Sequence, residues 1–172
     1  MITIHTKRLI LEPLGIKYLK TVHEYASDIE NTKYMIYLPN ETMGETMDFL
    51  QKADAEWMSD TPSFYEFAII YENQQIGSVS IDLEGDSSGE LGWIINKKYW
   101  KQGIAYEAAA ALIDFSKREL NIKHFIAHCD AENIASYKTM EKLGMSRTST
   151  HGGRKNRASD EERTEYRYEL FI

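Results

Sequence analysis

The stretch that most constrains the fold runs from residue 90 to residue 117 and reads ELGWIINKKYWKQGIAYEAAAALIDFSK. Its apolar run at residues 91–95 predicts a β-strand. A short basic loop ending at Gly103 follows, and then apolar residues recur at helical spacing, at Ile104, Ala108, Ala111, Leu112 and Phe115. The first N–H groups of a helix have no intrahelical partner and sit at the positive end of its dipole. A strand that feeds such a loop therefore predicts a phosphate-binding site.

The rest of the chain alternates between strand and helix patterns. Strands are predicted over residues 3–14, 64–71, 75–83, 90–95, 123–130, 145–150 and 163–172. Helical spacing recurs at residues 19–26, 47–58 and 133–143, in addition to the helix after Gly103. A strand–helix–strand unit within a run of hairpins is typical of an α/β (α+β) fold with a mixed sheet. No repeat or boundary is evident, so residues 1–172 are predicted to form a single domain.

Composition excludes several classes of function. The net charge of −7 argues against a nucleic-acid-binding surface, and no apolar run approaches the ~20 residues that span a bilayer. Cys129 is the only cysteine, which excludes an intrachain disulfide and fits a cytoplasmic protein. The five histidines show no metal-ligand spacing, so no metal site is predicted. Residues 53–96 hold nine acidic residues and no Lys or Arg, which indicates either a solvated acidic surface or a wall for a cation.

Five motifs in sequence order carry a resemblance to a known family. They are TKRLIL at 6–11, YLP at 37–39, the stretch at 90–108, DAENIAS at 130–136 and EKLGM at 141–145. Over nearly the whole chain they resemble the GNAT superfamily of N-acetyltransferases, in the branch of the ribosomal-protein N-terminal acetyltransferases. The resemblance implies a mostly antiparallel sheet of about seven strands, splayed between the fourth and fifth, with about four flanking helices. It also implies acetyl-CoA as the acyl donor.

The resemblance assigns cofactor-binding residues along two motifs. Backbone amides of the loop would hold the pyrophosphate, with Lys97 and Lys98 adding charge nearby; the loop residues are Lys101, Gln102, Gly103, Ile104 and Ala105. The strand residues Trp93, Ile94 and Ile95 would run along the pantetheine arm. A bulge in that strand would let the N–H of Trp93 or Ile94 polarise the thioester carbonyl.

The second motif offers two residues, each with an alternative reading. Asn133 would donate its amide to the pantetheine arm, and it also suits a helix N-cap. Ser136 is either a first-turn helix residue or a hydroxyl that faces the departing sulfur. The position seven residues after Asn133, where many superfamily members have a tyrosine acid, holds Met140. Ser136 is therefore the candidate catalytic acid, and the thiolate leaving without a dedicated acid is the alternative.

The attacking amine must lose a proton, which calls for a base. Glu90 is the first candidate because it lies on the cofactor strand, and Glu66 and Asp82 on neighbouring strands are alternatives. His128 is a second possible base, and each of these groups also reads as an ordinary strand side chain. Cys129 alternates with His128 and is expected on the opposite face, in the core.

These assignments predict an acetyl-CoA-dependent N-acetyltransferase. No activated Ser or Cys arrangement is visible, so direct attack in a ternary complex is expected rather than an acyl-enzyme. The expected acceptor is a primary amine, either a protein N-terminus or a small cationic amine, entering beside the first two helices. The alternative is a catalytically degenerate acyl-CoA sensor or scaffold, which Met140 favours. No nucleic-acid or membrane partner is expected, and the chain is expected to be a monomer or homodimer.

Overall fold

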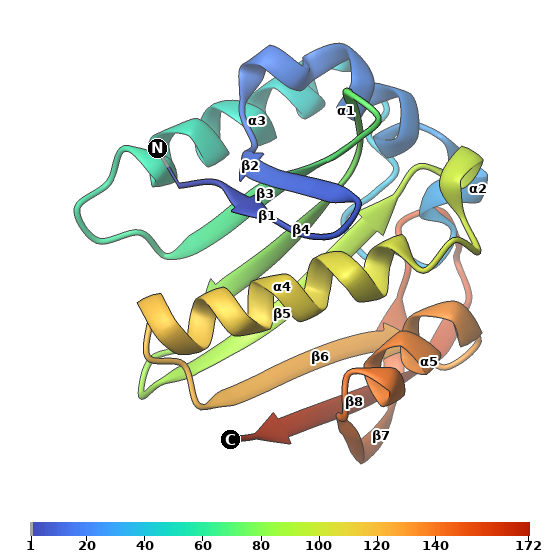
Figure 1. Ribbon diagram of the computed structural model, residues 1–172. Helices are drawn as coiled ribbons and strands as arrows, with labels where there is room; N and C mark the ends of the chain where they lie inside the picture. The colour runs from blue at the N-terminus through green and yellow to red at the C-terminus, as the bar shows by residue number, and fades with distance from the viewer. Residues whose placement is uncertain (1) are drawn as a thin grey trace.

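The computed structural model describes residues 2–172. Its centre is an eight-stranded sheet in the order β1-β2-β3-β4-β5-β6-β8-β7 (Figure 1). The strands are β1 (Ile4–His5), β2 (Leu9–Pro13), β3 (Phe64–Tyr71), β4 (Gln74–Leu83), β5 (Ser88–Ile95), β6 (His124–Asp130), β7 (Ser146–Lys155) and β8 (Glu162–Phe171). All neighbouring strands are antiparallel except β5 and β6, which are parallel.

The count exceeds the predicted seven strands because the first predicted strand divides in two. Within the stretch 3–14, the hydroxyl of Thr6 accepts the N–H of Leu9 at 2.9 Å and closes a turn between β1 and β2. The mixed, mostly antiparallel sheet that the sequence predicted is confirmed.

In the described part of the chain, five α-helices and two 3-10 turns accompany the sheet. They are η1 (Ile16–Tyr18), α1 (Leu19–Ala26), α2 (Ile29–Thr32), α3 (Met43–Trp57), η2 (Lys97–Tyr99), α4 (Ile104–Glu119) and α5 (Ile134–Lys142). The four helices expected from periodicity are present, and α2 is additional because four residues are too few to show a helical period. Within residues 2–172, no helix combines the length and apolar character that a bilayer crossing requires.

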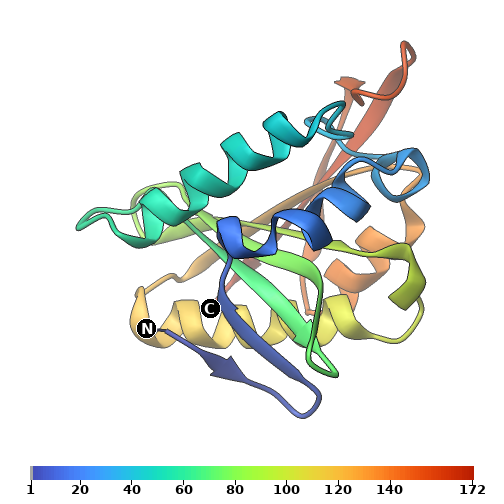
Figure 2. The ribbon, with the colours of Figure 1, turned by 90° about the horizontal axis from the view of Figure 1, so that it is seen from above.

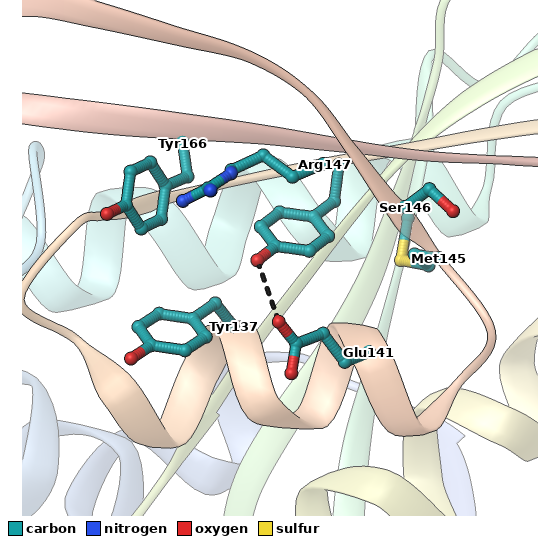
Figure 3. A pocket seen from close by; sticks show the side chains of 7 residues that line it. Tyr137, Glu141, Met145, Ser146, Arg147 and Tyr166 are labelled. Carbon is teal, nitrogen blue, oxygen red and sulfur yellow. Dashed lines mark hydrogen bonds between the residues drawn. The ribbon is translucent and has the colours of Figure 1, made fainter.

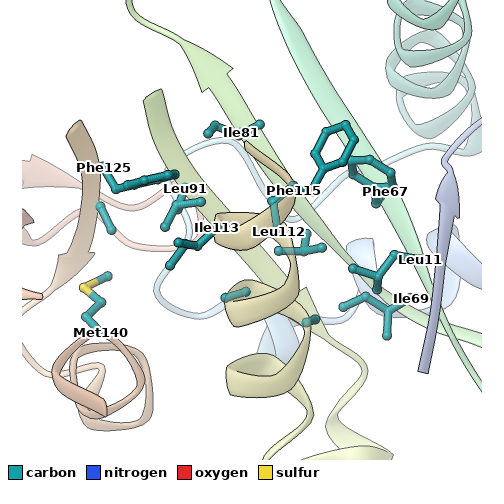
Figure 4. Close-up of a cluster of buried hydrophobic side chains, with 14 of the residues drawn as sticks. Leu11, Phe67, Ile69, Ile81, Leu91, Leu112, Ile113, Phe115, Phe125 and Met140 are labelled. Atoms are coloured by element: carbon teal, nitrogen blue, oxygen red, sulfur yellow. The ribbon is translucent and has the colours of Figure 1, made fainter. Parts of the chain in front are cut away.

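The helices cover both faces of the sheet. Figure 2 shows α1 and α3 above the sheet and α4 below it. The larger apolar cluster lies on the α4 side, where Leu112 and Phe115 of α4 lie among Phe67 of β3, Leu91 of β5 and Phe125 of β6 (Figure 4). A smaller cluster under α1 and α3 involves six buried residues, Leu14, Val22, Tyr25, Ala26, Leu50 and Ala68. The buried polar residues Glu66 and Ser78 lie on this second face, because their strand neighbours Phe67 and Val79 belong to the larger cluster.

The sheet splays between β5 and β6. The two strands pair only at their start, where Ser88, Gly89 and Glu90 face residues 124–126. From Leu91 onward β5 pairs with β4 alone, which confirms the predicted splay. The predicted bulge in β5 is wrong, because the register with β4 is unbroken from Gly89 to Ile95. Divergence of β6, rather than a bulge, frees this edge of β5.

Candidate active site

The free edge of β5 presents backbone groups to the gap. The N–H of Asn96 donates to the carbonyl of Ile76 at 2.8 Å, and hydrogen-bonded pairs alternate along an antiparallel ladder. Ile94 therefore bonds to β4, and Trp93 directs its N–H and C=O toward the gap instead. Of the two residues proposed to polarise a carbonyl, the register thus favours Trp93 over Ile94. Ile95 is already occupied, because its carbonyl accepts the indole N–H of Trp100 at 2.8 Å.

The loop before α4 has the geometry of an anion site. Lys101 and Gly103 have positive φ angles of 62° and 73°, and Gly103 is the N-cap residue of α4. No side chain caps this helix, so the first-turn N–H groups of Ile104 and Ala105 remain open. Gln102 is exposed beside them. The arrangement fits a phosphate, since consecutive amides and a sixteen-residue helix dipole point at one place.

Two of the three candidate lysines are engaged elsewhere. Lys97 forms ion pairs with Asp28 at 2.9 Å and Glu30 at 2.8 Å. Lys98 forms an ion pair with Glu24 at 2.5 Å. These three acids, from α1 and from the start of α2, neutralise the charge of both lysines. Lys101 has no acidic partner within residues 2–172 and is the remaining cationic candidate at the loop.

Asn133 caps α5, and its amide is still available. Its side-chain oxygen accepts the N–H of Ser136 at 3.3 Å, while its amide nitrogen donates to no protein group within residues 2–172. Asn133 is therefore the N-cap residue of α5, and its contact with the ligand stays a prediction that is compatible with this role. Met140 is 1% exposed in the core and offers no acid. Tyr137 packs edge-on against Tyr166 at 5.7 Å between ring centroids.

The four candidate bases share one face of the sheet. Glu66, Asp82 and Glu90 lie on neighbouring strands, in register with Ser80, Glu90 and Ile126 respectively. This face lies under α1 and α3, because Leu91 and Cys129, of opposite orientation, belong to the α4-side cluster. The prediction that Cys129 is buried in the core, opposite His128, is confirmed.

Glu90 and His128 form a hydrogen-bonded pair. The Nδ1 atom of His128 lies 2.7 Å from Oε1 of Glu90, with side chains 23% and 37% exposed. The hydrogen bond to Glu90 raises the pKa of His128 above its ordinary value, and burial opposes this only in part. The sequence suggested each residue separately. It held no signal for the pair, which depends on the parallel register of Glu90 with Ile126.

Glu66 is the buried carboxyl of this face. It is 9% exposed, and burial raises its pKa to about 7, although the hydroxyls of Ser78 and Ser80 partly offset the effect. The charge of Asp82 raises the pKa further. The side chain of Asp82 is exposed, and its pKa is also raised. The main cause is that nearby protein displaces part of the water around its carboxylate, and the second is the negative charge of Glu90. The face therefore runs from a buried acid at β3 to an open one at the end of β4.

Two cavities lie away from these groups. One, of about 340 Å³, lies between α5 and the β7–β8 pair, with Tyr137 and Glu141 of α5 on one side and Arg147 and Tyr166 on the other (Figure 3). The hydroxyl of Tyr168 donates to Glu141 there at 3.2 Å. The other, of about 740 Å³, lies between α1 and the β3–β4 turn. Neither is lined by Trp93, Glu90 or His128. Within residues 2–172, no group of three or more His, Cys, Asp or Glu side chains is placed to hold a metal ion.

Comparisons with known proteins agree with this geometry. The chain superimposes on an acetyltransferase of the GNAT family from Bacillus anthracis with a TM-score of 0.84, at 29% identity and over 99% of this chain and 98% of that one. It superimposes on RimL, the ribosomal L7/L12 alpha-N-protein acetyltransferase in complex with coenzyme A, with a TM-score of 0.86 at 14% identity, again over 99% and 98% of the two chains. The splayed sheet is thus the fold of the N-acetyltransferases.

The sequence comparisons show the family. Residues 8–146 match the family model described as the acetyltransferase (GNAT) domain. A curated relative from Bacillus subtilis (strain 168), the uncharacterized N-acetyltransferase YnaD, is 32% identical over 149 residues, which cover 84% of this chain and 82% of that protein. The chain belongs to the GNAT acetyltransferase family and is an acetyltransferase enzyme.

Proposed function

We propose that the protein transfers acetyl from acetyl-CoA to a cationic primary amine by direct attack in a ternary complex. The observation that carries this proposal is the Glu90–His128 pair, at the point where β6 diverges from β5. When bound, acetyl-CoA supplies the acetyl group as a thioester. The protein must then hold the donor, remove a proton from the amine and stabilise charge on the carbonyl oxygen.

His128 is the proposed base and Glu90 orients it. A proton on Nδ1 of His128 satisfies the carboxylate of Glu90, which leaves Nε2 as the acceptor for a proton from the amine. Nε2 contacts no protein hydrogen-bonding group within residues 2–172. The raised pKa makes His128 a stronger base than a free imidazole, which favours proton removal from an ammonium group. Glu90 is thus proposed to act in a pair rather than alone.

The remaining roles follow from the edge and the loop. The N–H of Trp93 is proposed to donate to the carbonyl oxygen, and the amides from Lys101 to Ala105 to hold the pyrophosphate. The free amide of Asn133 is proposed to bind the pantetheine arm, and Ser136 to protonate the departing sulfur. Burial raises the pKa of the Cys129 thiol to about 11, which supports direct attack over an acyl-cysteine.

The acidic face supports a cationic acceptor. Glu66 is a buried carboxyl that forms no ion pair within residues 2–172, and a buried charge is costly without a counter-charge. Above about pH 7, where Glu66 is ionised, it gives this face together with Asp82 a negative potential that attracts ammonium groups. A protein N-terminus and a small polyvalent amine both fit this chemistry. RimL, which shares the fold, is named for acetylating a ribosomal protein N-terminus.

Release of free thiol from acetyl-CoA, measured across an acceptor panel, tests the proposal. The panel pairs peptides with primary amines that differ only in a distal ammonium, hydroxyl or carboxylate. Ammonium acceptors are expected to give the highest kcat/KM, and a preference for neutral acceptors would refute the electrostatic argument. Stabilisation by CoA without turnover of any amine would instead favour the sensor alternative.

Substitutions at the pair test the proposed base. His128→Gln is expected to lower kcat by about 10²-fold or more, since general-base catalysis contributes typically 10²–10⁴-fold. Ser136→Ala tests the acid: a loss of less than about threefold would mean that the thiolate leaves without it. Glu84→Gln is the matched control, because Glu84 is exposed in the turn between β4 and β5. An unchanged kcat in His128→Gln would refute the role of the pair.

A further inference from the structure

The segment from Asp28 to Tyr37, called here the strap, spans the mouth of the splayed sheet. At one end it contacts the residues that join β5 to α4, through Asp28 and Asn31. At the other end its backbone carbonyls are held from the β7–β8 side. Arg154 donates to the carbonyl of Tyr34 at 2.7 Å, and the N–H of Arg157 donates to that of Met35 at 3.0 Å. Figure 1 shows α2 at this position, beside the end of β5 and the connection between β7 and β8.

Asn31 is the polar centre of the contact with β5. Its Nδ2 donates to the carbonyl of Ile95 at 3.0 Å, and its Oδ1 accepts the N–H of Lys97 at 2.6 Å. Asn31 is 9% exposed, and its own N–H is held by Asp28 at 2.8 Å. One buried side chain thus binds the last carbonyl of β5, at Ile95, and the first N–H of the following turn, at Lys97.

These two bonds fix the direction in which the chain leaves β5. The carbonyl of Ile95 points away from β4 into the splay, where β6 does not reach it and where the indole of Trp100 and the amide of Asn31 both donate to it. The next residues form η2, and six residues after Lys97 the chain reaches Gly103 at the N-cap of α4. Without Asn31, the N–H of Lys97 loses its acceptor and the connection gains freedom at its root.

We infer that Asn31 is a positioning residue for acetyl-CoA, which acts by holding the root of the phosphate-binding loop and does not touch the ligand. The inference rests on the proposed function, because it assumes that the loop from Lys101 to Ala105 holds the pyrophosphate. Loss of Asn31 weakens the binding of donors that carry the pyrophosphate and spares donors that lack it.

The test compares acetyl-CoA with S-acetylpantetheine, which has the same thioester and arm without the nucleotide. Asn31→Ala is expected to lower kcat/KM for acetyl-CoA by about tenfold through KM, the effect of about one net hydrogen bond. The kcat at saturating acetyl-CoA and the kcat/KM for S-acetylpantetheine are expected to change less than twofold. Asn31→Asp keeps an acceptor for the N–H of Lys97 but sets an oxygen against the carbonyl of Ile95, so it is not expected to restore the binding of acetyl-CoA.

Glu30→Gln is the matched control on the same helix. It removes an ion pair of a 66% exposed side chain with Lys97 and leaves both Asn31 bonds in place, so both donors should behave as in wild type. Hydrogen exchange of the ligand-free proteins is expected to speed up at residues 97–105 in Asn31→Ala and not in the control. An equal loss for both donors, or no loss for acetyl-CoA, overturns the inference.

Calorimetry can measure the affinity of the same proteins for CoA and for pantetheine, and this measurement needs no acetyl transfer. A wild-type protein that binds CoA and transfers no acetyl group would contradict the proposed function. In that case Asn31→Ala is still expected to weaken CoA and spare pantetheine. A protein whose wild-type form binds neither compound overturns both.

Discussion

The buried carboxyl of Glu66 gives the sharpest quantitative prediction. Burial raises its pKa from 4.5 to about 7, so the folded protein retains this proton to a higher pH than the unfolded chain does. The contribution of Glu66 to stability is therefore most favourable below about pH 4.5, declines as the pH rises toward 7, and carries its whole penalty above that. At 1.36 kcal/mol per pH unit the penalty is about 3 kcal/mol.

Glu66→Gln removes the charge and keeps the shape. We expect this variant to be more stable than wild type by about 3 kcal/mol at pH 8, or about 6–12 °C in Tm for a chain of this size. At pH 4 the two proteins should differ by less than about 1 kcal/mol, because Glu66 is then protonated in both states. Chemical denaturation at several pH values between 4 and 8 measures the difference directly.

The pH dependence of the stability change distinguishes Glu66→Gln from its control. Glu72→Gln alters an exposed carboxylate with no ion pair within residues 2–172, and its effect should stay within about 0.5 kcal/mol at every pH. A Glu66→Gln gain of equal size at pH 4 and pH 8 would refute the linkage argument. A loss of stability at pH 8 would show that a counter-charge already satisfies Glu66 in the folded protein.

Three further substitutions separate the proposed roles. Glu90→Gln replaces the charged acceptor that raises the pKa of His128 with a neutral one. The acidic limb of the kcat/KM profile should therefore move to lower pH while the maximum falls, and an unmoved limb would assign it to another group. Gly103→Ala should lower stability by about 1–2 kcal/mol and weaken CoA binding, which calorimetry measures. Gly85→Ala is the control, because Gly85 has the same φ of 73° and an added Cβ there would meet no atom within 4 Å; it should lower stability and leave CoA binding unchanged. Asn133→Asp keeps the helix cap and removes the amide donor, so Tm should hold and the Kd of CoA should rise; an unchanged Kd would restrict Asn133 to capping.

The sequence predicted the helices and strands better than the contacts between them. Strands and the four longer helices follow from local periodicity, and the splay between β5 and β6 followed from the family resemblance. The pairing of Glu90 with His128 could not be read in this way, because it depends on a parallel register set by only three residues of each strand. The bulge expected in β5 failed for a related reason, since divergence of β6 frees the same backbone groups.

The charge pattern illustrates the same limit. Lys97, Lys98 and Lys101 read as one basic loop, yet acids from α1 and the strap neutralise the first two. Those acids lie more than sixty residues away in the chain, so local composition held no sign of them. The role of Asn31 was missed for the same reason, because its partners Ile95 and Lys97 belong to another element.

A single strand explains how donor and acceptor are brought together. Along β5, Trp93 directs its backbone toward the gap, and Glu90, three residues earlier, directs its side chain to the face under α1 and α3. The donor can therefore lie along the edge of the strand while the amine approaches over its face. Gly92 lies between them, where an added Cβ would come within 2.9 Å of the Ser80 hydroxyl. A larger residue at this position would both disturb β4 and cover the path from Glu90 to the edge, so the absence of a side chain here keeps the two approaches open to each other.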